Sequence, residues 1–498
     1  MLWIALSLPE LPLQLAQRST PDQAKPLVIA EGPVTRPLVC CANNAAQQRG
    51  VSAGMPVAAA RALAGELTVL PRDPGAEAQA LHNLACWAGQ FTPNVVLQTA
   101  GLLLEVDSTL QLHGGLAALL ARVRKGVAQL GYEAAPGVAP TPLAAWWLAR
   151  ARQAGLSVRM CRDKSQLRER LAALPLSLLD WPGDTLQTLQ VLGIQRIGHC
   201  LQLPRDGFIR RFGHAPCLDL DKAQGLLPDP RIWFAAPDQF ASRLEFGFEL
   251  NDALALLFPL KRLLRELEGF LRSRGAGVQQ WQLLLEHWNH GRTRLSIGTA
   301  LPERSAERLL ALARERLTQL TLDAPVLALG IAAEQLQRFD ENNQSLVPDP
   351  RSRAIGWSQL LDKLTARLGK ERIQRLQVLD DARPELAWQR CAATAASGKL
   401  GVTTAAGRLA ATAASATTAP RPLWLLDPPR ALSSREGLPL CQGQLDLLAG
   451  PERIEAGWWD GHAACRDYYV ACNPRGETLW IYREHRREAH WYLHGIFA

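Results

Sequence analysis

The stretch ANNAAQQRGVSAGMPVAAARAL, residues 42–63, decides the fold of this 498-residue chain. Gly50 and Gly54 flank a turn, and the alanine-rich run after Gly54 has the composition of a helix. By themselves these residues predict only a turn that leads into a helix. The segments before and after them show which fold contains that turn.

The composition is that of an ordinary globular protein, with 47% apolar and 20% charged residues. The length suggests about three domains. No apolar run approaches the ~20 residues needed to span a bilayer. The N-terminus has no basic residues before its apolar stretch, so it does not have the pattern of a signal peptide. We therefore expect a cytoplasmic protein.

The ten cysteines are scattered, with one adjacent pair at Cys40–Cys41 and no CxxC spacing. Only His462, Cys465 and Cys472 have a spacing that resembles a metal site, and four ligands at structural zinc spacing are missing. We therefore predict reduced thiols, no metal and no cofactor. A net charge of +8 permits an acidic partner such as nucleic acid.

The first 160 residues alternate strand-like and helical runs, which predicts an α/β or α+β region. IALSLPELPLQLA at 4–16 begins as a buried strand, and GLLLEVDSTLQL at 101–112 predicts another. Between 168 and 235 short helices separated by Pro-Gly and Leu-Gly-Ile breaks predict helix-hairpin-helix packing. From 250 to 335, two amphipathic helices alternate with strand-like runs, which predicts helices on a small antiparallel sheet.

The last third of the chain changes character twice. Residues 391–420 are a low-complexity Ala/Thr/Gly segment without large apolar side chains, which predicts a flexible linker. Residues 421–498 are rich in aromatic residues and turns, which predicts a small β-rich module. The simplest interpretation of most of its aromatic side chains is the core of that module.

Three segments, in the correct order, resemble Y-family DNA polymerases. The opening stretch is similar to the fingers of that family, with matches at Ala42, Asn43, Ala46, Gly50, Val51, Met55 and Pro56. YEAAPGVAPTPLAAWWLAR at 132–150 matches a palm motif at Gly137, Val138, Ala139 and Ala145. Residues 178–213 are similar to the thumb, and the resemblance covers about 1–335.

The resemblance implies an α+β fold in five parts. These are a palm with fingers at 1–165, a helical helix-hairpin-helix thumb at 166–235, an α/β little finger at 236–338, a clamp-binding and flexible linker region at 339–420, and a small β-rich C-terminal module at 421–498.

Nucleotidyl transfer needs two divalent ions held by carboxylates, and cationic or phenolic donors on the triphosphate. The chain lacks these groups at the positions where the family has them. Ser7 and Pro9 replace the metal-binding aspartates, Asn44 and Gln47 replace a tyrosine and an arginine, and Pro142 and Trp146 replace two lysines. A serine hydroxyl is a poor Mg²⁺ ligand without carboxylate help. The resemblance therefore implies a palm that no longer catalyses.

Glu105 and Asp107 lie in the segment where the family has an adjacent Asp-Glu pair. They are two residues apart, so we expect both to point to the same face of a strand. One interpretation is that they are remnants of a metal site. The other, which we favour, is that they are polar residues at the end of a strand.

The whole pattern resembles a catalytically inactive, UmuC/DinB-like branch of the family that serves in a bacterial damage-induced mutasome. GPERIEAGWWDG at 450–461, RDYYV at 466–470 and WYLHGIFA at 491–498 resemble the small C-terminal domain of that branch. The implied function is that of a non-catalytic adaptor in SOS-induced translesion synthesis and mutagenesis. It links damaged primer-template DNA, the bacterial sliding clamp, an error-prone replicative-type polymerase and a RecA-like accessory protein. The alternatives are an active translesion DNA polymerase and a DNA-binding repair factor without clamp contact.

Candidate DNA contacts lie in the thumb and the little finger. Gly183 begins a helix whose free N–H groups suit a phosphate. The remaining candidates are cations that would bind DNA without regard to sequence: Arg205, Arg210, Arg211, Arg292 and Arg294. For each single arginine, solvated surface charge is the alternative.

Two peptides resemble the Q-L-[SD]-L-F string that binds sliding clamps. The one favoured by its position after the little finger is NQSLV: Asn343, Gln344, Ser345, Leu346 and Val347. The one that matches the string better is QLDLL: Gln444, Leu445, Asp446, Leu447 and Leu448. The second peptide adjoins a predicted strand of the C-terminal module.

Overall fold

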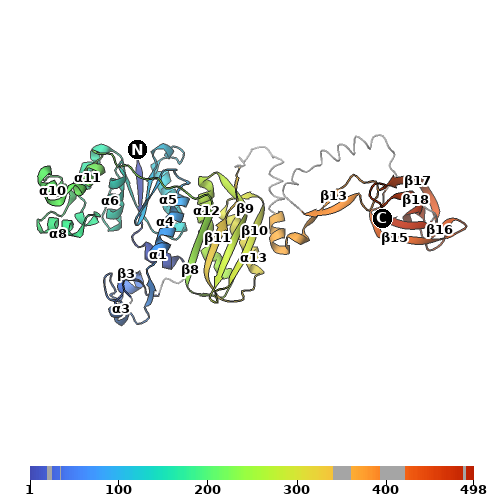
Figure 1. Ribbon diagram of the computed structural model, residues 1–498, viewed down its shortest axis with the longest axis horizontal. Coiled ribbons are helices and arrows are strands. Elements are labelled where there is room, and N and C mark those ends of the chain that lie inside the picture. The colour runs from blue at the N-terminus through green and yellow to red at the C-terminus, as the bar shows by residue number, and fades with distance from the viewer. Residues whose placement is uncertain (20–24, 34, 340–359, 393–420, 486–489, 498) are drawn as a thin grey trace. The chain divides into compact units, whose positions relative to one another are not determined.

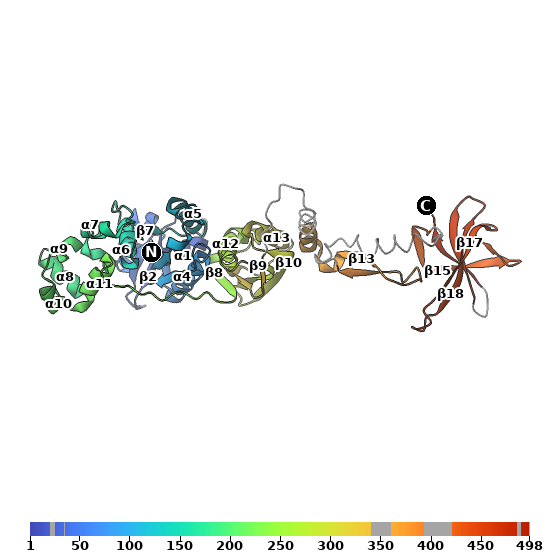
Figure 2. The same cartoon turned by 90° about the horizontal axis from the view of Figure 1, so that it is seen from above.

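The computed structural model describes residues 1–19, 25–33, 35–339, 360–392, 421–485 and 490–497 (Figure 1). The chain forms two compact units, Met1–Val347 and Pro348–Ala498. In the first unit, the thumb helices lie on one side of the palm and the little-finger sheet lies on the other, as both views show (Figures 1 and 2).

The palm is a four-stranded antiparallel sheet in the order β5-β6-β1-β7. The predicted first strand, β1, is an inner strand between β6 and β7, and all five of its residues are buried. Ile4 and Leu6 pack against the helices α4 and α5, while Trp3 and Ala5 on the other face pack against α6. The elements are β1 (Trp3–Ser7), β5 (Val95–Gln98), β6 (Gly101–Glu105), β7 (Ala135–Ala139), α1 (Leu11–Ser19), α4 (Pro74–Ala88), α5 (Leu116–Gln129) and α6 (Pro142–Gln153).

The fingers contain the opening stretch of the sequence. Asn43 caps α2, since its Oδ1 accepts from the N–H groups of Ala46 and Leu27, each at 3.0 Å. Gly50 and Gly54 have φ values of 87° and 82°, which allows the tight turn before α3. The turn and helix are therefore as predicted. The elements are β2 (Leu27–Glu31), β3 (Leu38–Ala42), β4 (Thr68–Pro71), α2 (Asn44–Gln47) and α3 (Val57–Leu63).

The thumb is entirely helical, as the breaks in its sequence predicted. Gly193, at φ 76°, ends one helix and Gly213, at φ 82°, separates two others. Phe208 and Leu220 join the same core as α6 of the palm. The helices are α7 (Leu167–Ala172), α8 (Gly183–Val191), α9 (Ile197–Cys200), α10 (Arg205–Phe212) and α11 (His214–Gln224).

The little finger is an antiparallel sheet in the order β10-β9-β11-β8, with β12 paired to β9. Along β8 buried and exposed residues alternate, as expected for a sheet with one covered face. The helix α12 packs against this sheet, against α13, and against α4 of the palm. The elements are β8 (Phe240–Leu250), β9 (Ala276–His287), β10 (Arg292–Glu303), β11 (Val326–Ala333), β12 (Leu336–Arg338), α12 (Leu257–Ser273) and α13 (Ala306–Thr318).

The second unit contains a six-stranded sheet in the order β16-β15-β20-β19-β18-β17. This is the predicted β-rich module, and aromatic side chains such as Tyr468, Trp480 and Tyr482 lie in its core. The strands are β15 (Trp424–Arg435), β16 (Leu438–Leu440), β17 (Asp446–Ala456), β18 (Ala464–Cys472), β19 (Thr478–Glu484) and β20 (Trp491–Ile496).

Within the region 339–420, expected to contain a clamp-binding segment and a flexible linker, residues 360–392 are folded. Residues 360–368 are helical, and β13 (Gln374–Val378) pairs with β14 (Trp388–Ala392) in a hairpin. The loop of this hairpin contacts the C-terminal module, because Arg383 pairs with Asp460. A single buried ion pair leaves no hydrophobic pattern in the sequence, so the contact could not be anticipated. Residues 340–359 and 393–420 lie outside the described part of the chain.

Candidate functional site in the palm

Ser7 ends the central strand of the palm, where the family resemblance places a metal ligand. Its Cα lies opposite Gly101 on β6 and Ala135 on β7. Ser7 is 2% exposed, and its Oγ donates to Oε1 of Gln153 at 2.9 Å. The hydroxyl is therefore engaged by a side chain of α6.

Gly101 leaves no room for a side chain beside Ser7. It has a φ of 157°, and a Cβ on it would lie 2.0 Å from the carbonyl oxygen of Leu6 and 3.0 Å from the ring of Trp146. Trp146 is itself only 6% exposed. A carboxylate at position 101 would have to displace both the backbone of β1 and this indole.

The structure also shows the surroundings of the other positions where the resemblance predicts catalytic groups. Pro9 is exposed in the turn between β1 and α1. Pro142 is the first residue of α6, where its missing N–H costs nothing. In the fingers, Asn44 is exposed at the start of α2, and Nε2 of Gln47 donates to the carbonyl of Ala42 at 2.7 Å.

Glu105 and Asp107 lie at the other end of the palm sheet from Ser7. Glu105 is opposite Trp3, four residues along β1, or roughly 13 Å at the usual strand rise. Its carboxylate accepts from Nδ2 of Asn94 and from the N–H of Asp107, each at 3.2 Å. This placement fits the interpretation of Glu105 as a polar residue at a strand end.

The expectation that Glu105 and Asp107 share one face of a strand is wrong. The strand β6 ends at Glu105, and Asp107 begins a 3-10 turn, Asp107–Thr109. A turn breaks the alternation of a strand, so the two-residue spacing no longer relates the side chains. Asp107 is exposed and lies 3.1 Å from the α-amino group of Met1.

The palm residues do not fit a pair of divalent ions. Beside Ser7 they offer a hydroxyl that is already bonded and a glycine that faces backbone. Across the described residues, no three or more His, Cys, Asp and Glu side chains are grouped to hold a metal ion. Near the sequence-predicted spacing, Sγ of Cys465 donates to Glu455 and Sγ of Cys472 to the carbonyl of Asn473.

In the thumb, the structure separates the candidate arginines into two kinds. Arg205 forms an ion pair with the buried residue Asp221, and its Nη1 donates to Oδ1 at 3.0 Å. Hydrogen bonding to that carboxylate raises the pKa of Arg205. Arg210 and Arg211 are exposed in the last turn of α10 and contact no acidic group in the described segments. Gly183 begins α8 and is exposed.

In the little finger, Arg292 and Arg294 lie on the exposed face of β10, opposite Glu286 and Leu284 of β9. Nη2 of Arg292 is 4.0 Å from a carboxylate oxygen of Glu286. Within the described residues Arg294 has no acidic partner. The two arginines therefore differ, although the sequence treats them alike.

An ion-pair network on the same sheet was missed in the sequence. Arg243 of β8 donates to Glu286 at 2.8 Å and to Glu245 at 2.9 Å. Gly330 of β11 lies between their strands and has no side chain to block the contact. Arg243 lowers the pKa of Glu286 through this hydrogen bonding. The sequence shows Arg243 and Glu245 two positions apart, as expected for side chains on one face of a strand. It does not show that Glu286 of β9 lies near them.

A second missed feature is a buried polar network between the palm and the little finger. Arg18 of α1 pairs with Glu266 of α12, and they are 4% and 1% exposed. Glu266 also accepts from Ser242 Oγ at 2.7 Å, and that Oγ accepts from Asn83 Nδ2 at 2.9 Å. Nη1 of Arg18 donates to the hydroxyl of Tyr132. Nothing in the sequence pairs residues 248 positions apart.

The structure describes only one of the two clamp-like peptides. NQSLV at 343–347 lies outside the described residues. In QLDLL, Leu445 is 2% exposed and belongs to the core of the second unit, whereas Leu447 and Leu448 are 41% and 61% exposed on the edge strand β17. An extended peptide from 444 to 448 would have to remove Leu445 from that core.

Comparison with known proteins first shows which class of protein the chain resembles. Residues 13–150 match the impB/mucB/samB family, and this range covers most of the palm and fingers. A solved chain described as "Y-family DNA polymerase chimera Dbh-Dpo4(243-245)-Dbh" is 19% identical, with a TM-score of 0.39, and covers 68% of this chain and 99% of its own. The "insertion ternary complex of Dbh DNA polymerase" is 17% identical, with a TM-score of 0.39, and covers 69% of this chain and 100% of its own. The match over residues 13–150 is thus a likeness of the palm and fingers to this family, and the first unit itself has an α+β fold.

The similarity also extends to individual proteins. The chain is 27% identical to Protein ImuB of Caulobacter vibrioides (strain NA1000 / CB15N) over 471 residues, which cover 90% of this chain and 100% of that protein. DNA polymerase IV of Dehalococcoides mccartyi (strain CBDB1) is 25% identical over 266 residues, or 52% of this chain and 67% of that protein. Together these likenesses support an ImuB-type, Y-family polymerase-like protein, and they confirm the resemblance expected from the sequence.

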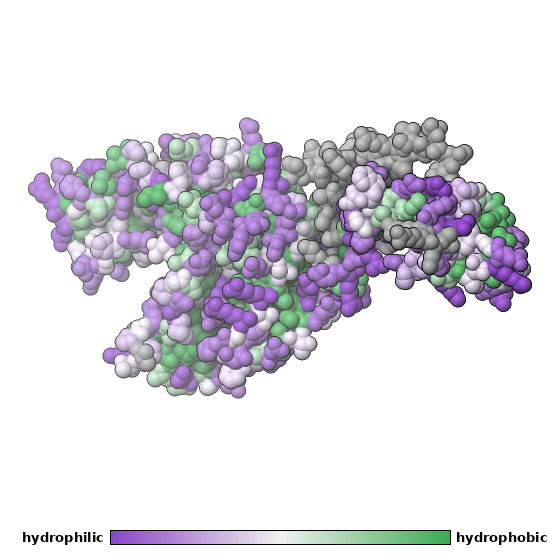
Figure 3. Space-filling model, turned by 45° about the vertical axis from the view of Figure 1, so that its right-hand side comes forward, coloured by the Kyte–Doolittle hydropathy of each residue, from purple (hydrophilic) through white to green (hydrophobic). Residues whose placement is uncertain are grey.

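None of the helices in the described ranges has the length and apolar character needed to cross a membrane. Hydrophilic side chains predominate on the face drawn in Figure 3, with hydrophobic patches between them.

Proposed function

We propose that this chain is a non-catalytic adaptor in translesion synthesis at damaged DNA, in keeping with its likeness to ImuB and to DNA polymerases. As a cytoplasmic component of the SOS response, it would hold an error-prone replicative-type polymerase, a RecA-like accessory protein and the sliding clamp at a primer-template. The observation that carries the proposal is the closed palm edge, where Gly101 faces the backbone of Leu6 and the ring of Trp146.

The physical reason is that nucleotidyl transfer needs two ions to stabilise the attacking and leaving oxygens. At the palm edge, α6 holds Ser7 through Gln153, and no carboxylate is near it in the strand register. Without metal ligands in the palm, the chain can still present a surface to DNA, because phosphate contacts need only cations and N–H groups. Arg210, Arg211 and Arg294 suit such contacts, because they are exposed and have no acidic partner in the described segments.

A primer-extension assay with Mg²⁺ and with Mn²⁺ tests the loss of catalysis. We expect no template-dependent incorporation above a no-protein control. Incorporation that disappears in Glu105→Ala or Asp107→Ala would establish the rival function, an active translesion polymerase. A polymerase known to be active, assayed in parallel, controls for the substrate.

For the clamp, we propose that NQSLV at 343–347 is the binding peptide. The burial of Leu445 supports this choice, since QLDLL cannot bind as an extended peptide without disturbing the core. Pull-down on the sliding clamp should fail for Leu346→Ala/Val347→Ala and persist for Leu447→Ala/Leu448→Ala. Retention by both variants would leave the clamp contact without a site, and failure of the wild type to bind the clamp would favour a DNA-binding factor without clamp contact.

A further inference from the structure

The hairpin of β13 and β14 in the second unit has no covered face. All five residues of β13 are exposed, and so are Trp388, Gln389 and Arg390 of β14. The two strands form a sheet by themselves, and no third strand among the described residues pairs with either of them. A two-stranded hairpin is only marginally stable alone in water. Its side chains are therefore accessible to a ligand, and its position requires support from another part of the chain.

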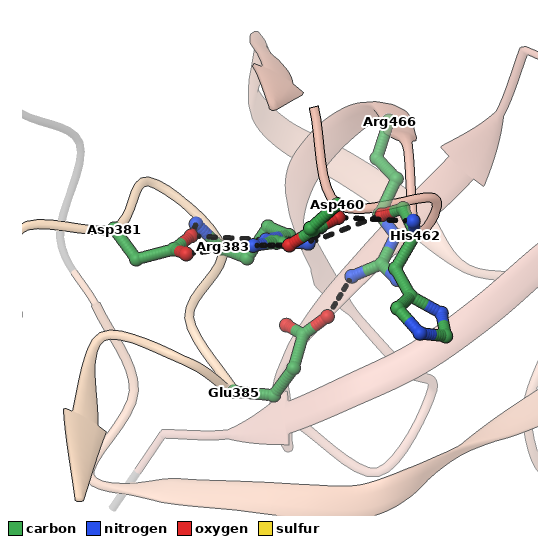
Figure 4. Close-up of polar contacts among 6 residues, drawn as sticks. All are labelled: Asp381, Arg383, Glu385, Asp460, His462 and Arg466. Carbon is green, nitrogen blue, oxygen red and sulfur yellow. Dashed lines mark hydrogen bonds and ion pairs between the residues drawn. The ribbon is translucent and has the colours of Figure 1, made fainter. Parts of the chain in front are cut away.

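The loop of the hairpin provides that support through the ion pairs drawn in Figure 4. Arg383 is 3% exposed, and its Nη2 donates to Asp460 of the module at 2.6 Å and to Asp381 of the loop at 2.8 Å. Two residues further along the loop, Glu385 accepts from Nη1 of Arg466 at 2.8 Å. The pairs of Arg383 with Asp460 and of Glu385 with Arg466 thus fix the loop to the C-terminal module and leave the strands uncovered.

One face of the hairpin combines apolar side chains with an arginine. In the register of the two strands, Val378 is opposite Trp388 and Leu376 is opposite Arg390. Leu376 and Val378 are 69% and 70% exposed, and Trp388 is 41% exposed. Residues opposite each other, and residues two apart along one strand, lie on the same face of a sheet. These four side chains therefore form one exposed surface, the Trp388 face.

The opposite face of the hairpin is polar. There Gln377 is opposite Gln389, and Arg375 is opposite Cys391. Nε of Arg375 donates to Sγ of Cys391 at 3.1 Å. The two faces thus differ in chemistry although they share the same strands, so residues of the polar face are matched controls for residues of the Trp388 face.

The two strands differ in charge from the C-terminal module. They contain Arg375 and Arg390 and no aspartate or glutamate, and the exposed Arg372 lies two residues before β13. Residues 421–485 and 490–497 contain seven arginines and no lysine against nine aspartates and glutamates. Within the described part of the chain, Arg372 and Arg390 have no acidic partner. These two cations are therefore able to neutralise the phosphates of a nucleic acid.

The composition of the Trp388 face favours a single strand of nucleic acid over a duplex and over a protein. Sequence-independent binding of single strands combines aromatic rings, on which bases stack, with cations along the backbone. Arg390 follows Trp388 by two residues, or about 7 Å along the strand. A duplex stacks its bases on one another and leaves no base face for an indole. A protein that covered the face would bury Arg390 at a cost in free energy unless it supplied an acidic partner.

We propose that the Trp388 face binds single-stranded DNA, with a base stacked on Trp388 and phosphates neutralised by Arg390 and Arg372. This site goes beyond the proposed function, whose DNA contacts lie in the thumb and the little finger of the first unit. It gives the second unit a contact of its own with unpaired template. The choice of DNA over RNA rests on the proposed function, whereas the stacking surface rests on the exposure, register and charge of the hairpin.

The test measures the binding of the full-length chain to a labelled oligothymidylate of about 16 nucleotides by fluorescence anisotropy. Trp388→Ala should weaken binding about 5- to 150-fold, because one base loses its stacking partner. Trp388→Phe should retain most of the affinity. Arg390→Ala should lower the slope of log affinity against log salt by about 0.7. All three variants should keep the circular dichroism spectrum and melting temperature of the wild type, because both side chains are exposed.

Two controls and a crosslink assign the effect to this face. Gln377→Ala changes the opposite face, and Trp424→Ala removes an indole that is 67% exposed on β15, so both should bind like the wild type. Photocrosslinking of an oligonucleotide that carries 5-iodouracil should modify the peptide that contains Trp388. Mass spectrometry identifies that peptide even if the thumb and the little finger bind the same oligonucleotide.

A further variant tests the support of the hairpin. Arg383→Ala leaves the Trp388 face in place and removes the ion pair with Asp460, so it should weaken binding to the oligothymidylate and lower the melting temperature of the second unit. Full binding by Arg383→Ala would show that the fixed loop is not needed and would overturn that part of the proposal.

The outcomes separate the Trp388 face from the proposed function. Unchanged affinity of Trp388→Ala, without a crosslink at Trp388, overturns the face and leaves the adaptor function intact. Template-dependent incorporation by the wild type would overturn the adaptor function and leave the face intact. An equal loss of affinity for duplex DNA would overturn base stacking, and tighter binding of oligouridylate would overturn the choice of DNA. A Trp388→Ala variant that loses only protein binding or self-association would replace the DNA site by a protein contact.

Discussion

The palm edge at Ser7 and the interface between palm and little finger differ in the charged side chains that they contain. At the edge, a neutral hydroxyl and an indole lie at positions where the resemblance predicts a metal-binding carboxylate and a cation, and Gly101 lies beside them. At the interface, Arg18 and Glu266 are almost completely buried and paired. Buried charge is tolerated where it joins two parts of the fold and is absent where catalysis would need it.

The interface shows what a buried ion pair requires. Taking two charges out of water costs several kcal/mol per ion, and the pair compensates only when the remaining polar groups are also satisfied. Arg18 donates to the carbonyl of Leu130 at 2.9 Å as well as to Tyr132, and Ser242 donates to the second oxygen of Glu266. The neighbouring surface is closely packed, because a Cβ on Gly269 would lie 2.3 Å from Trp87. The little finger is thus joined to the palm by a buried ion pair and by close packing.

The largest effect that would break this comparison is expected at Glu266. Replacing it by alanine leaves Arg18 buried without its partner, which should lower the free energy of unfolding of the first unit by about 3–5 kcal/mol. Urea denaturation measures this loss. The matched control is Arg272→Ala on the same helix, whose exposed pair with Glu268 is worth about 0–1 kcal/mol. Equal effects of the two variants would contradict the role of the buried network.

A somewhat smaller effect is expected at the palm edge. Gly101→Ala places a Cβ against the carbonyl of Leu6, and such overpacking should cost about 1–3 kcal/mol of unfolding free energy. The control is Gly65→Ala, where a Cβ meets open space. If Gly101→Ala is as stable as its control, the palm edge has room for a side chain, and the closure that carries the adaptor proposal is lost.

On the little finger, the comparison is sharpened by two arginines of one exposed face. Arg294→Ala should weaken non-specific DNA binding and reduce the slope of log affinity against log salt by about 1, because one phosphate contact is lost. Arg243→Ala is the control, since Glu245 and Glu286 already neutralise Arg243. Fluorescence anisotropy over a salt series gives both slopes. An unchanged slope for Arg294→Ala would remove this strand from the DNA-binding surface.

The smallest effect is a pH dependence in the second unit. Hydrogen bonds from Arg453, with that of His485, lower the pKa of Asp467 to about 2, against about 3.9 in an unfolded chain. A depressed folded pKa stabilises the fold above the unfolded value, and this contribution is lost as the pH falls from about 4 to about 2. Thermal unfolding of the full chain across that range should show a steeper loss for the wild type than for Asp467→Asn. Parallel curves would contradict the assignment.

Local sequence patterns were sufficient where one segment meets its own neighbours. The turn at Gly50 and Gly54, the buried strand before Ser7 and the helical breaks at Gly193 and Gly213 all appear as expected. Each follows from periodicity or from a backbone conformation that glycine favours. The prediction that Glu105 and Asp107 share one face was wrong because β6 ends at Glu105, whereas the two-residue spacing requires a strand that continues to Asp107.

The sequence by itself predicted the class that this protein resembles, because the order and spacing of motifs are properties of the chain. Only the tertiary structure decided that Gly101 and Trp146 close the palm edge, that Arg18 reaches Glu266, and that Arg383 pairs with Asp460. Each of these contacts joins residues between 45 and 248 positions apart. Their physical basis is steric exclusion and the pairing of buried charge, which depend on distance in space and leave no periodic pattern along the chain.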